Sequence, residues 1–295
     1  MTEAKSKEVL AQERLDARAA KDFAKADLLR DQIAALGFEV IDVAGGFEFR
    51  EKERFPTYAS TRDIKAIKIN GDIAITLIVD GFTADAAETV RTIKAHTDTP
   101  IIALVSGDPA ELVAEIDLQF QVISITENFG WGENANALLK NISSKFLVIM
   151  DPSTRFTGDA ISLVVAELSK GEFSAAGWHG GLVNTDDEWR SVDDKGAGEV
   201  DVLFSYFLAI NVADATNAGG FNNRAIYYRN ADIEFCLRLR QSNGRLLQMD
   251  PVHMHYKSCL SCAVRTKKCD PFTFIDGQVY AEESLVPIGI GKCQI

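Results

Sequence analysis

Hydrophobic positions between residues 71 and 151 follow two alternating patterns. Short, uninterrupted apolar runs are typical of strands that are buried on both faces of a parallel sheet. Between these runs, apolar residues recur at the three- and four-residue spacing of amphipathic helices. Strands are predicted at 73–79, 101–105, 122–125 and 146–150, and helices at 83–95, 110–116 and 133–141. The alternation predicts a doubly wound α/β sheet with its ligand crevice at the carboxyl ends of the strands.

The first part of the chain has a different pattern, because residues 2–36 contain no glycine and no proline. Its apolar residues predict two amphipathic helices that break near Lys21, with Asp22 capping the second helix and Gly37 ending it. A short strand is expected at 38–43. The predicted organisation is a helical hairpin with a strand at 1–50, a charged linker or lead-in strand at 51–72, an α/β domain at 73–257 and a cysteine-containing tail at 258–295.

Composition narrows the classes of function. The 295 residues carry a net charge of −12, which argues against a broad surface for nucleic acid or anionic membranes. No apolar run approaches the length of a transmembrane segment, and the polar N-terminus does not resemble a signal peptide, so we expect a cytoplasmic protein. The five cysteines are an odd number in a chain without such a signal, which argues against a disulfide framework.

A helix predicted to begin near Asp232 carries the strongest candidate for catalysis. Asp232 and Glu234 lie in its first turn, where the helix dipole favours negative charge. The residues expected on its packed face are Ile233, Cys236, Leu237 and Arg240. This arrangement places Asp232 at the mouth of the core as a candidate general base. The residues alone favour a structural role, in which Asp232 caps the helix and Glu234 pairs with Arg238.

Residues 219–256, GGFNNRAIYYRNADIEFCLRLRQSNGRLLQMDPVHMHY, resemble the acceptor-side segment of family 2 glycosyltransferases. That family shows a glycine-rich turn, aromatic residues, a helix with the pattern Glu-Asp-x-Asp-x-Cys-x-Arg, a strand and then histidine. The resemblance implies a GT-A fold, the Rossmann-like fold of nucleotide-diphospho-sugar transferases, with Asp232 as the catalytic base. Ala231 stands where the family has the first glutamate.

A glycine-rich turn at 127–137, ENFGWGENANA, extends the resemblance on the donor side. Its glycines permit close approach of the backbone, and the N-terminus of the following helix favours phosphate, although such turns are common. In the family this helix helps to frame the nucleotide-sugar pocket. The resemblance therefore implies that Asn128, Gly130 and Asn134 are substrate-binding residues.

Asp151-Pro152-Ser153 follows the strongest apolar strand and stands where the family carries Asp-x-Asp. The resemblance implies that Asp151 binds the donor and helps to hold Mg²⁺ or Mn²⁺ on its diphosphate, since oxygen ligands suit these cations. Ser153 replaces the second carboxylate and is a poorer cation ligand. A plain turn is the alternative interpretation of these residues.

Other polar residues are weaker candidates. Asp80 ends the first predicted strand, and Asp108 lies near Ser106, where the family often has an aspartate that recognises the base. His255 matches a position at which family members often use histidine to support the diphosphate or its metal. Trp178 belongs either to an acceptor-side loop or to a packed aromatic cluster. A structural zinc ion, with free thiols as the alternative, is suggested by Cys259, Cys262 and Cys269.

The opening hairpin, residues 17–50, is similar to the C-terminal tail of bacterial cysteinyl-tRNA synthetases. The acidic charge balance favours packing, dimerisation or partner docking over RNA contact for this segment. The main domain is expected to be an inverting glycosyltransferase of the hexosyltransferase type, moving a sugar from a nucleoside-diphosphate-sugar to an acceptor hydroxyl. The alternatives are a GT-A-like binding or scaffold protein that has lost catalysis, and an RNA-associated factor that docks through the hairpin.

Overall fold

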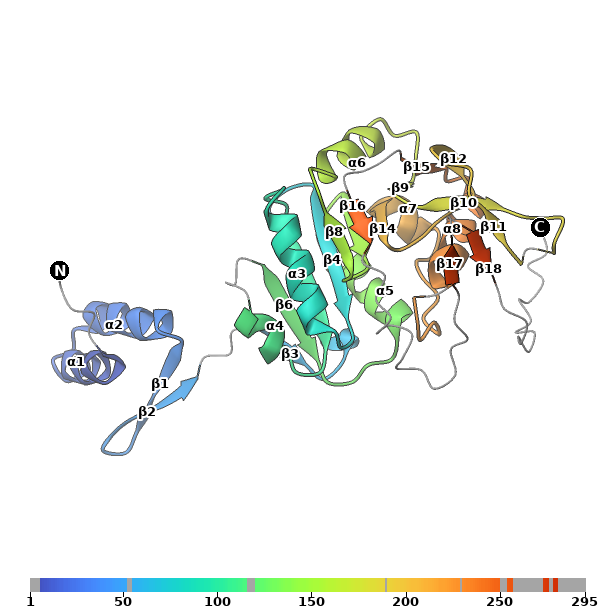
Figure 1. The fold of residues 1–295 in the computed structure, drawn as a ribbon. Coiled ribbons are helices and arrows are strands. Elements are labelled where there is room, and N and C mark those ends of the chain that lie inside the picture. Colours follow the sequence, from blue (N-terminus) through green and yellow to red (C-terminus); the bar gives the residue numbers. More distant parts are fainter. Residues whose placement is uncertain are drawn as a thin grey trace. The chain divides into compact units, whose positions relative to one another are not determined.

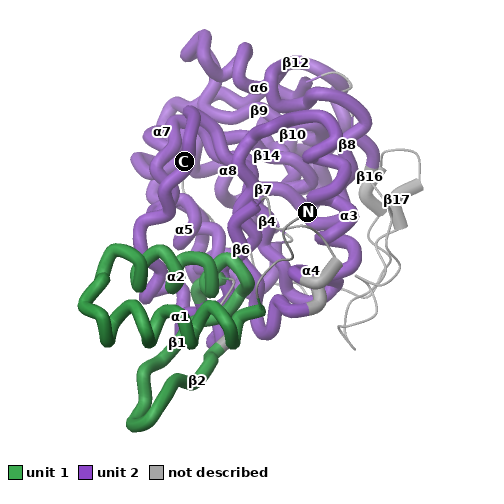
Figure 2. Tube along the Cα trace, turned by 90° about the vertical axis from the view of Figure 1, so that its left-hand side faces the viewer, with its two compact units in different colours: residues 1–56 green, residues 57–295 purple. Residues whose placement is uncertain are grey.

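The computed structural model describes residues 6–51, 55–115, 120–188, 190–228, 230–249, 254–256, 273–275 and 278–280. The chain divides into two compact units, residues 1–56 and residues 57–295, which Figure 2 shows in different colours. Each unit has a hydrophobic core of its own. The cysteines of the suggested zinc site, Cys259, Cys262 and Cys269, lie outside the described residues.

The N-terminal unit is a helical hairpin followed by a two-stranded antiparallel sheet (Figure 1). Its elements are α1 (Lys7–Ala19), α2 (Phe23–Ala35), β1 (Phe38–Val43) and β2 (Gly46–Glu51). The Asp22 carboxylate caps α2 by accepting the Lys25 N–H at 3.1 Å, and Gly37 follows the helix with φ +85°. Its core consists of Leu10, Ala11, Ala17, Ala26, Leu29, Ile33 and Val40. Both predicted helices, the break between them and the first strand are confirmed.

The second unit is built on a nine-stranded mixed sheet, in the order β12-β15-β9-β14-β7-β4-β5-β6-β3. Its parallel half, with the connecting helices, comprises β3 (Thr57–Tyr58), β4 (Ile73–Val79), α3 (Thr83–Lys94), β5 (Ile101–Ser106), α4 (Ala110–Glu115), β6 (Gln121–Ile125), α5 (Trp131–Asn141) and β7 (Phe146–Met150). The other half comprises β9 (Ala175–Gly177), β12 (Gly198–Val200), β14 (Phe207–Asn211) and β15 (Leu246–Gln248). The α/β class and the elements predicted between residues 73 and 150 are confirmed. The range 51–72, expected as a linker or lead-in strand, contributes β3 to the edge of the sheet.

The order of the parallel strands reverses next to β4. Strands β5 and β6 follow on one side of β4, whereas β7 pairs with its other side. Strand β14 is antiparallel to both β7 and β9, and β15 is parallel to β9, so β7, β9 and β15 run in the same direction. The carboxyl ends of β4, β5, β6, β7, β9 and β15 therefore lie at one edge of the sheet. The reversal between β4 and β7 is the place where open α/β sheets bind ligands.

Shorter elements surround this sheet. They are η1 (Thr61–Asp63), β8 (Thr154–Phe156), α6 (Ile161–Leu168), β10 (Gly180–Val183), β11 (Val192–Asp193), β13 (Val202–Leu203), α7 (Val212–Asn217), α8 (Ala231–Gln241), β16 (Met254–Tyr256), β17 (Thr273–Ile275) and β18 (Gln278–Tyr280). Helix α8 contributes to the same core as the central strands, because Phe235 and Leu239 cluster with Leu208 and Leu246. Among the described residues, no helix combines the length and apolar character needed to cross a membrane.

Candidate active site

The sheet brings several of the predicted site residues to one edge. Asp80 follows β4, Asp108 follows β5, Asn128 lies beyond β6 and Asp151 follows β7. Trp178 follows β9, which runs in the same direction as β7. Residues from five separate strands therefore gather at the carboxyl edge, and Asp80 and Asp151 flank the reversal between β4 and β7.

Asp151 is buried and firmly held, with 9% of its surface exposed. Its Oδ1 atom accepts hydrogen bonds from the Ser153 N–H at 2.7 Å and from the Ser153 hydroxyl. Its backbone N–H donates to the Tyr206 carbonyl at 3.4 Å, and its carbonyl accepts the Thr154 N–H at 3.0 Å. Burial raises the pKa of Asp151, and the Ser153 hydrogen bonds oppose that rise. The family motif has a second carboxylate at the position of Ser153. In this chain Ser153 instead donates hydrogen bonds to the Asp151 carboxylate.

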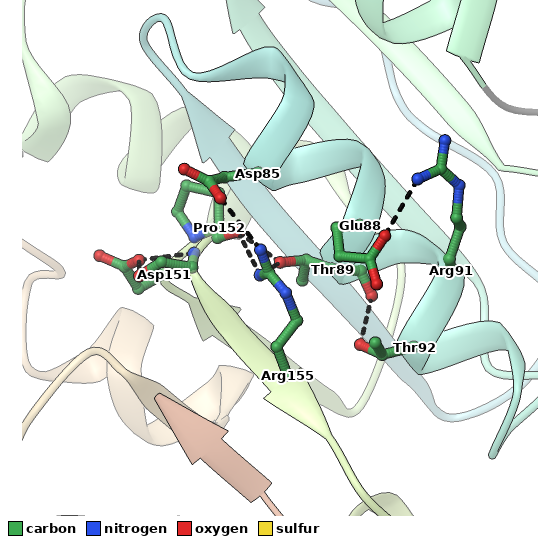
Figure 3. A network of polar contacts seen from close by, with 9 residues as sticks. Asp85, Glu88, Thr89, Arg91, Thr92, Asp151, Pro152 and Arg155 are labelled. Carbon is green, nitrogen blue, oxygen red and sulfur yellow. Dashed lines mark hydrogen bonds and ion pairs between the residues drawn. The ribbon is translucent and has the colours of Figure 1, made fainter. Parts of the chain in front are cut away.

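A polar network joins the Asp151 turn to helix α3 (Figure 3). The Arg155 guanidinium, on β8, donates to the Pro152 carbonyl at 3.0 Å and to the Thr89 hydroxyl, and forms an ion pair with Asp85 at 3.2 Å. Sequence reasoning missed this network. The available signal was a polar stripe of Asp85, Thr89 and Thr92 at i, i+4 and i+7, which places the three side chains on one face of α3.

Asp232 is almost completely buried, with 4% of its surface exposed. Its Oδ2 atom accepts the Ser205 N–H at 2.9 Å and the Ser205 hydroxyl at 3.1 Å, and Oδ1 accepts the Ile233 N–H at 2.9 Å. Burial raises the pKa of Asp232, while these hydrogen bonds lower it. A carboxylate whose pKa is raised by burial is a candidate for proton transfer.

The position of Asp232 on its helix differs from the prediction. The expected packed face is correct only in part. Cys236 is buried, and Ile233 and Leu237 are half-buried against the core, but Arg240 is exposed. The fully buried residues of α8 are Ala231, Asp232, Phe235, Cys236 and Leu239. Asp232 shares this face because residues three and four positions apart on a helix lie one above the other. It therefore lies within the core instead of at its mouth.

Two structural expectations for α8 are confirmed. Glu234 forms an ion pair with Arg238 at 2.5 Å, at i,i+4 spacing. Cys236 is a fully buried free thiol whose Sγ contacts the backbone of Leu203, and burial raises the pKa of this thiol.

Two consecutive residues contact the two buried aspartates. Ser205 donates to Asp232, and the next residue, Tyr206, provides the carbonyl that binds the backbone of Asp151. Strand β14 begins immediately afterwards, with Phe207 opposite Met150 of β7. Segments that lie about 80 residues apart in the chain are therefore tied to a single short turn at the carboxyl edge.

Trp178 lies beside this turn. Its backbone N–H donates to the Phe207 carbonyl at 3.4 Å, and the centroid of its ring lies 4.2 Å from that of His179. The His179 ring meets Tyr206 edge-on, with centroids 5.9 Å apart, and burial lowers the pKa of His179. Trp178 is thus a half-buried member of an aromatic cluster next to Ser205 and Tyr206, in agreement with the packed interpretation made for it.

The glycine-rich turn packs against the segment that precedes α8. The N–H groups of Trp131 and Gly132 donate to the carbonyls of Ile226 and Ala225 at 3.0 and 2.9 Å. A Cβ on Gly132 would lie 2.0 Å from the Asn222 carbonyl oxygen. The prediction that this helix N-terminus offers its amides to phosphate is therefore wrong for these two groups, because the chain itself occupies them.

The polar residues of this turn have structural partners. The Asn128 Oδ1 atom accepts the Gly130 N–H at 3.0 Å and the Asn134 side-chain amide at 3.2 Å. The Asn136 side chain bonds both backbone groups of Phe221, each at 2.8 Å. The two sequence segments that resemble glycosyltransferases, 127–137 and 219–256, are therefore joined by hydrogen bonds.

The remaining candidates are more exposed. Asp80 is exposed at the end of β4, and Asp108 accepts the Ala110 N–H at 2.9 Å as the cap of α4. His255 is exposed on β16, opposite Arg155 of β8. Within the described parts of the chain, no group of three or more His, Cys, Asp or Glu side chains could hold a metal ion.

Comparisons with known proteins give a short sequence match. A segment of 39 residues in the N-terminal part is 62% identical to a cysteine–tRNA ligase of Nitratidesulfovibrio vulgaris (strain DSM 19637 / Miyazaki F), and 56% identical to that of strain DP4. The match covers 13% of this chain and 8% of each ligase. No protein-family model matches the chain.

Solved structures give a longer but weaker match. The mannosyltransferase PcManGT from Pyrobaculum calidifontis, in complex with GDP-Man and Mn²⁺, matches with a TM-score of 0.48 and 13% identity, over 68% of this chain and 59% of that one. GalNAc-T7 with UDP, GalNAc and Mn²⁺ matches with a TM-score of 0.47 and 11% identity, over 68% of this chain and 44% of that one.

Proposed function

We propose that the second unit is a glycosyltransferase of the GT-A type, which moves a sugar from a nucleoside-diphosphate-sugar to an acceptor hydroxyl with inversion. The observation that carries this proposal is that the consecutive residues Ser205 and Tyr206 bind the Asp232 side chain and the Asp151 backbone. Both carboxylates are buried, and Ser205 and Tyr206 immediately precede β14, beside the carboxyl end of β7. The carboxyl edge of the sheet, at the strand reversal, is where a nucleotide binds in related architectures.

Asp232 is proposed as the general base. It would take the proton of the acceptor hydroxyl while the hydroxyl oxygen forms a bond to the anomeric carbon. The bond between that carbon and the diphosphate oxygen breaks at the same time, and the diphosphate leaves with the electron pair. Attack from the side opposite the leaving group inverts the configuration. Ser205 supports this role because its two donors fix Oδ2 and orient the carboxylate.

Asp151 is proposed to face the donor diphosphate together with a divalent cation. Mg²⁺ and Mn²⁺ are commonly held by one or two carboxylates plus substrate phosphates, so a single protein carboxylate fits such a cation. The cation would neutralise charge on the departing diphosphate. The neutral Ser153 hydroxyl and the exposed His255 are proposed to assist Asp151 in holding the diphosphate or its cation.

The other residues at the edge are proposed to contact the substrates. Asp80 and Asp108 would lie on the nucleotide side, because they follow the neighbouring strands β4 and β5. Trp178 would lie on the acceptor side, next to the Ser205–Tyr206 turn. Asn128, Gly130 and Asn134 are proposed to shape the pocket through the turn that they stabilise.

Ligand binding provides the first test of this proposal. Thermal shifts are to be measured with ADP, CDP, GDP and UDP, each with and without Mn²⁺. The proposal predicts that one diphosphate stabilises the protein and that Mn²⁺ increases the shift. The absence of any stabilisation would contradict it.

Asp232→Asn provides the second test. This variant is expected to lose transfer while keeping the fold and nucleotide binding, because only the proton acceptor is removed. Glu234→Gln is the matched control, since Glu234 lies on the same turn of α8 and its side chain is 41% exposed. Activity that survives in Asp232→Asn would exclude Asp232 as the base.

A binding or scaffold function is the second candidate, and specific observations favour it. Ala231 and Ser153 stand where the resembling family has carboxylates, and Asp232 is only 4% exposed. This candidate predicts nucleotide binding without turnover for any donor and acceptor. Measured transfer by the wild-type protein, lost in Asp232→Asn, would exclude it.

The N-terminal hairpin is proposed as a docking module for a protein partner or a second copy of the chain. An RNA-associated role has its own observation, the 39-residue similarity to tRNA ligases. That role predicts tRNA binding that weakens steeply with salt and disappears when residues 1–56 are removed. Salt-independent self-association through residues 1–56 would instead support dimerisation.

A further inference from the structure

Arg155 is a buried cation whose hydrogen bonds all serve the chain itself. Its side chain is 7% exposed and that of Asp85 is 18% exposed. Figure 3 shows the guanidinium between Asp85 on α3 and the Pro152 carbonyl, with the Asp151 carboxylate pointing away from it. Since Asp85, Thr89 and Pro152 engage this guanidinium, it is not directed at a ligand phosphate.

We propose that Arg155 is a positioning residue, which sets the direction of the Asp151 carboxylate by fixing the turn at Pro152. This inference rests on the proposed function, because it assumes that Asp151 faces a nucleoside diphosphate or its cation. It assigns the polar stripe on α3 to the same task, with Asp85 and Thr89 holding Arg155 in place.

The turn at Pro152 is held on every side. The proline ring fixes the φ angle of Pro152 and restricts Asp151 to extended backbone conformations. The Pro152 carbonyl accepts hydrogen bonds from both the Thr89 hydroxyl and the Arg155 guanidinium, so both of its lone pairs have donors. The backbone of Asp151 is bound by Tyr206 and by Thr154. These contacts leave the backbone of this turn little conformational freedom.

The fixed backbone in turn determines the carboxylate. Ser153 donates from both its N–H and its hydroxyl to Oδ1 of Asp151, which selects one side-chain orientation. Within the described part of the chain, the hydrogen bonds to this carboxylate both go to Oδ1 and not to Oδ2. Oδ2 is therefore the atom that the turn leaves for a ligand, and a change in the turn would redirect it.

Helix α3 supplies the rigid support for this arrangement. Thr92 accepts the Phe156 N–H of β8 at 3.2 Å, one turn further along the same stripe. Strand β8 is thereby attached to α3 at Arg155 and Phe156, and the turn before it at Pro152, while β8 also pairs with β16. Outer residues that orient a ligating carboxylate typically change metal affinity by about 10- to 100-fold when they are replaced.

The test uses two conservative variants of the full chain. Arg155→Lys keeps the charge beside Asp85 but loses the planar fork, and Thr89→Val keeps the shape but loses the hydroxyl. Binding of the nucleoside diphosphate that stabilises the wild type best is to be measured by calorimetry with Mn²⁺. Each variant is expected to bind about 10-fold more weakly than the wild type. Arg91→Lys is the matched control, because Arg91 is an α3 residue that pairs with Glu88 at the surface (Figure 3) and is expected to bind normally.

The same substitutions made together with Asp151→Asn distinguish a positioning role of Arg155 and Thr89 from a general effect on stability. A residue that acts through Asp151 adds no further loss once Asp151 is replaced, whereas an independent structural effect adds to it. Variants that bind as tightly as the wild type, or effects that persist unchanged beside Asp151→Asn, would overturn the proposed role alone. A wild-type protein that binds no nucleoside diphosphate would overturn the proposed function and this role with it.

Crystal structures give a measure that does not depend on affinity. The Arg155→Lys and Thr89→Val proteins are expected to show the Asp151 carboxylate displaced from its wild-type direction, while Arg91→Lys keeps it. An unchanged carboxylate in both variants would overturn the role even where binding is weak.

Discussion

At the scale of single residues, the burial of Asp232 determines the pH at which it can accept a proton. Burial raises its pKa, and the Ser205 hydroxyl is one of the groups that lower it. We expect the carboxyl carbon of Asp232, followed by NMR, to titrate above the range of an ordinary aspartate. Ser205→Ala is expected to move the titration to still higher pH, because a hydrogen bond to the charged form is lost. Titration at the ordinary value in both proteins would contradict this.

The sign of the effect on stability follows from the same shift. The folded state holds the proton of Asp232 more tightly than the unfolded state does. The stability gained from protonated Asp232 is therefore present below the pKa of the unfolded chain and is lost as the pH rises through the folded pKa. Activity that needs the ionised carboxylate increases as the pH rises through the same range. A rise in pH therefore favours activity and lowers the contribution of Asp232 to stability.

Gly132 lies where the absence of a side chain allows two segments of the chain to pack closely. In Gly132→Ala the new Cβ would lie 2.0 Å from the Asn222 carbonyl oxygen, which is backbone and cannot rotate away. We expect a loss of stability of about 1–3 kcal/mol, in the range for overpacked sites, measured by urea unfolding. Gly46→Ala is the control, since no heavy atom lies within 4 Å of its Cβ position. Equal stability of the two variants would show that the segments can separate at little cost.

At the scale of elements, the predictable parts are those whose burial is regular. Strand β7 is buried at every residue, so its uninterrupted apolar run predicts a strand in a parallel sheet. The short strands beyond residue 150 were not predicted, because elements of two or three residues, such as β13 and β8, are too short to establish a period. The packed face of α8 was predicted only in part, for a different reason. Asp232 itself lies on that face, and a buried carboxylate hides the pattern.

The cap of helix α2 gives a prediction for one element. Asp22→Ala removes the carboxylate that accepts the Lys25 N–H and is expected to cost about 1 kcal/mol, the usual value for an N-cap. The loss should appear in the thermal unfolding of the N-terminal unit. Asp27→Ala, which removes an exposed i,i+3 ion pair with Arg30 on the same helix, is expected to change stability by less than about 0.5 kcal/mol. Equal effects of the two variants would argue against capping by Asp22.

At the scale of the whole molecule, the candidate site depends on contacts that sequence reasoning did not anticipate. The resemblance singled out Asp151 and Asp232 individually, because each stands in a segment with its own motif. The residues that connect them, Ser205 and Tyr206, belong to no motif. Their role arises from the antiparallel insertion of β14 between β7 and β9. Arg155 was missed for a similar reason, since its partners lie on a helix about 65 residues earlier in the chain.

The separate cores of the two units lead to a prediction for the entire chain. Residues of the N-terminal unit form a cluster around Leu29 and Ile33, whereas the second unit has its own cluster around strands β4, β5 and β7. A chain that lacks residues 1–56 is therefore expected to keep the unfolding midpoint and the nucleotide binding of the second unit. The full-length protein should show an additional, smaller transition by calorimetry, and Asp22→Ala should shift that transition alone. A truncated protein that unfolds at a clearly lower temperature, or a single transition that Asp22→Ala moves as a whole, would show that the two units depend on each other for stability.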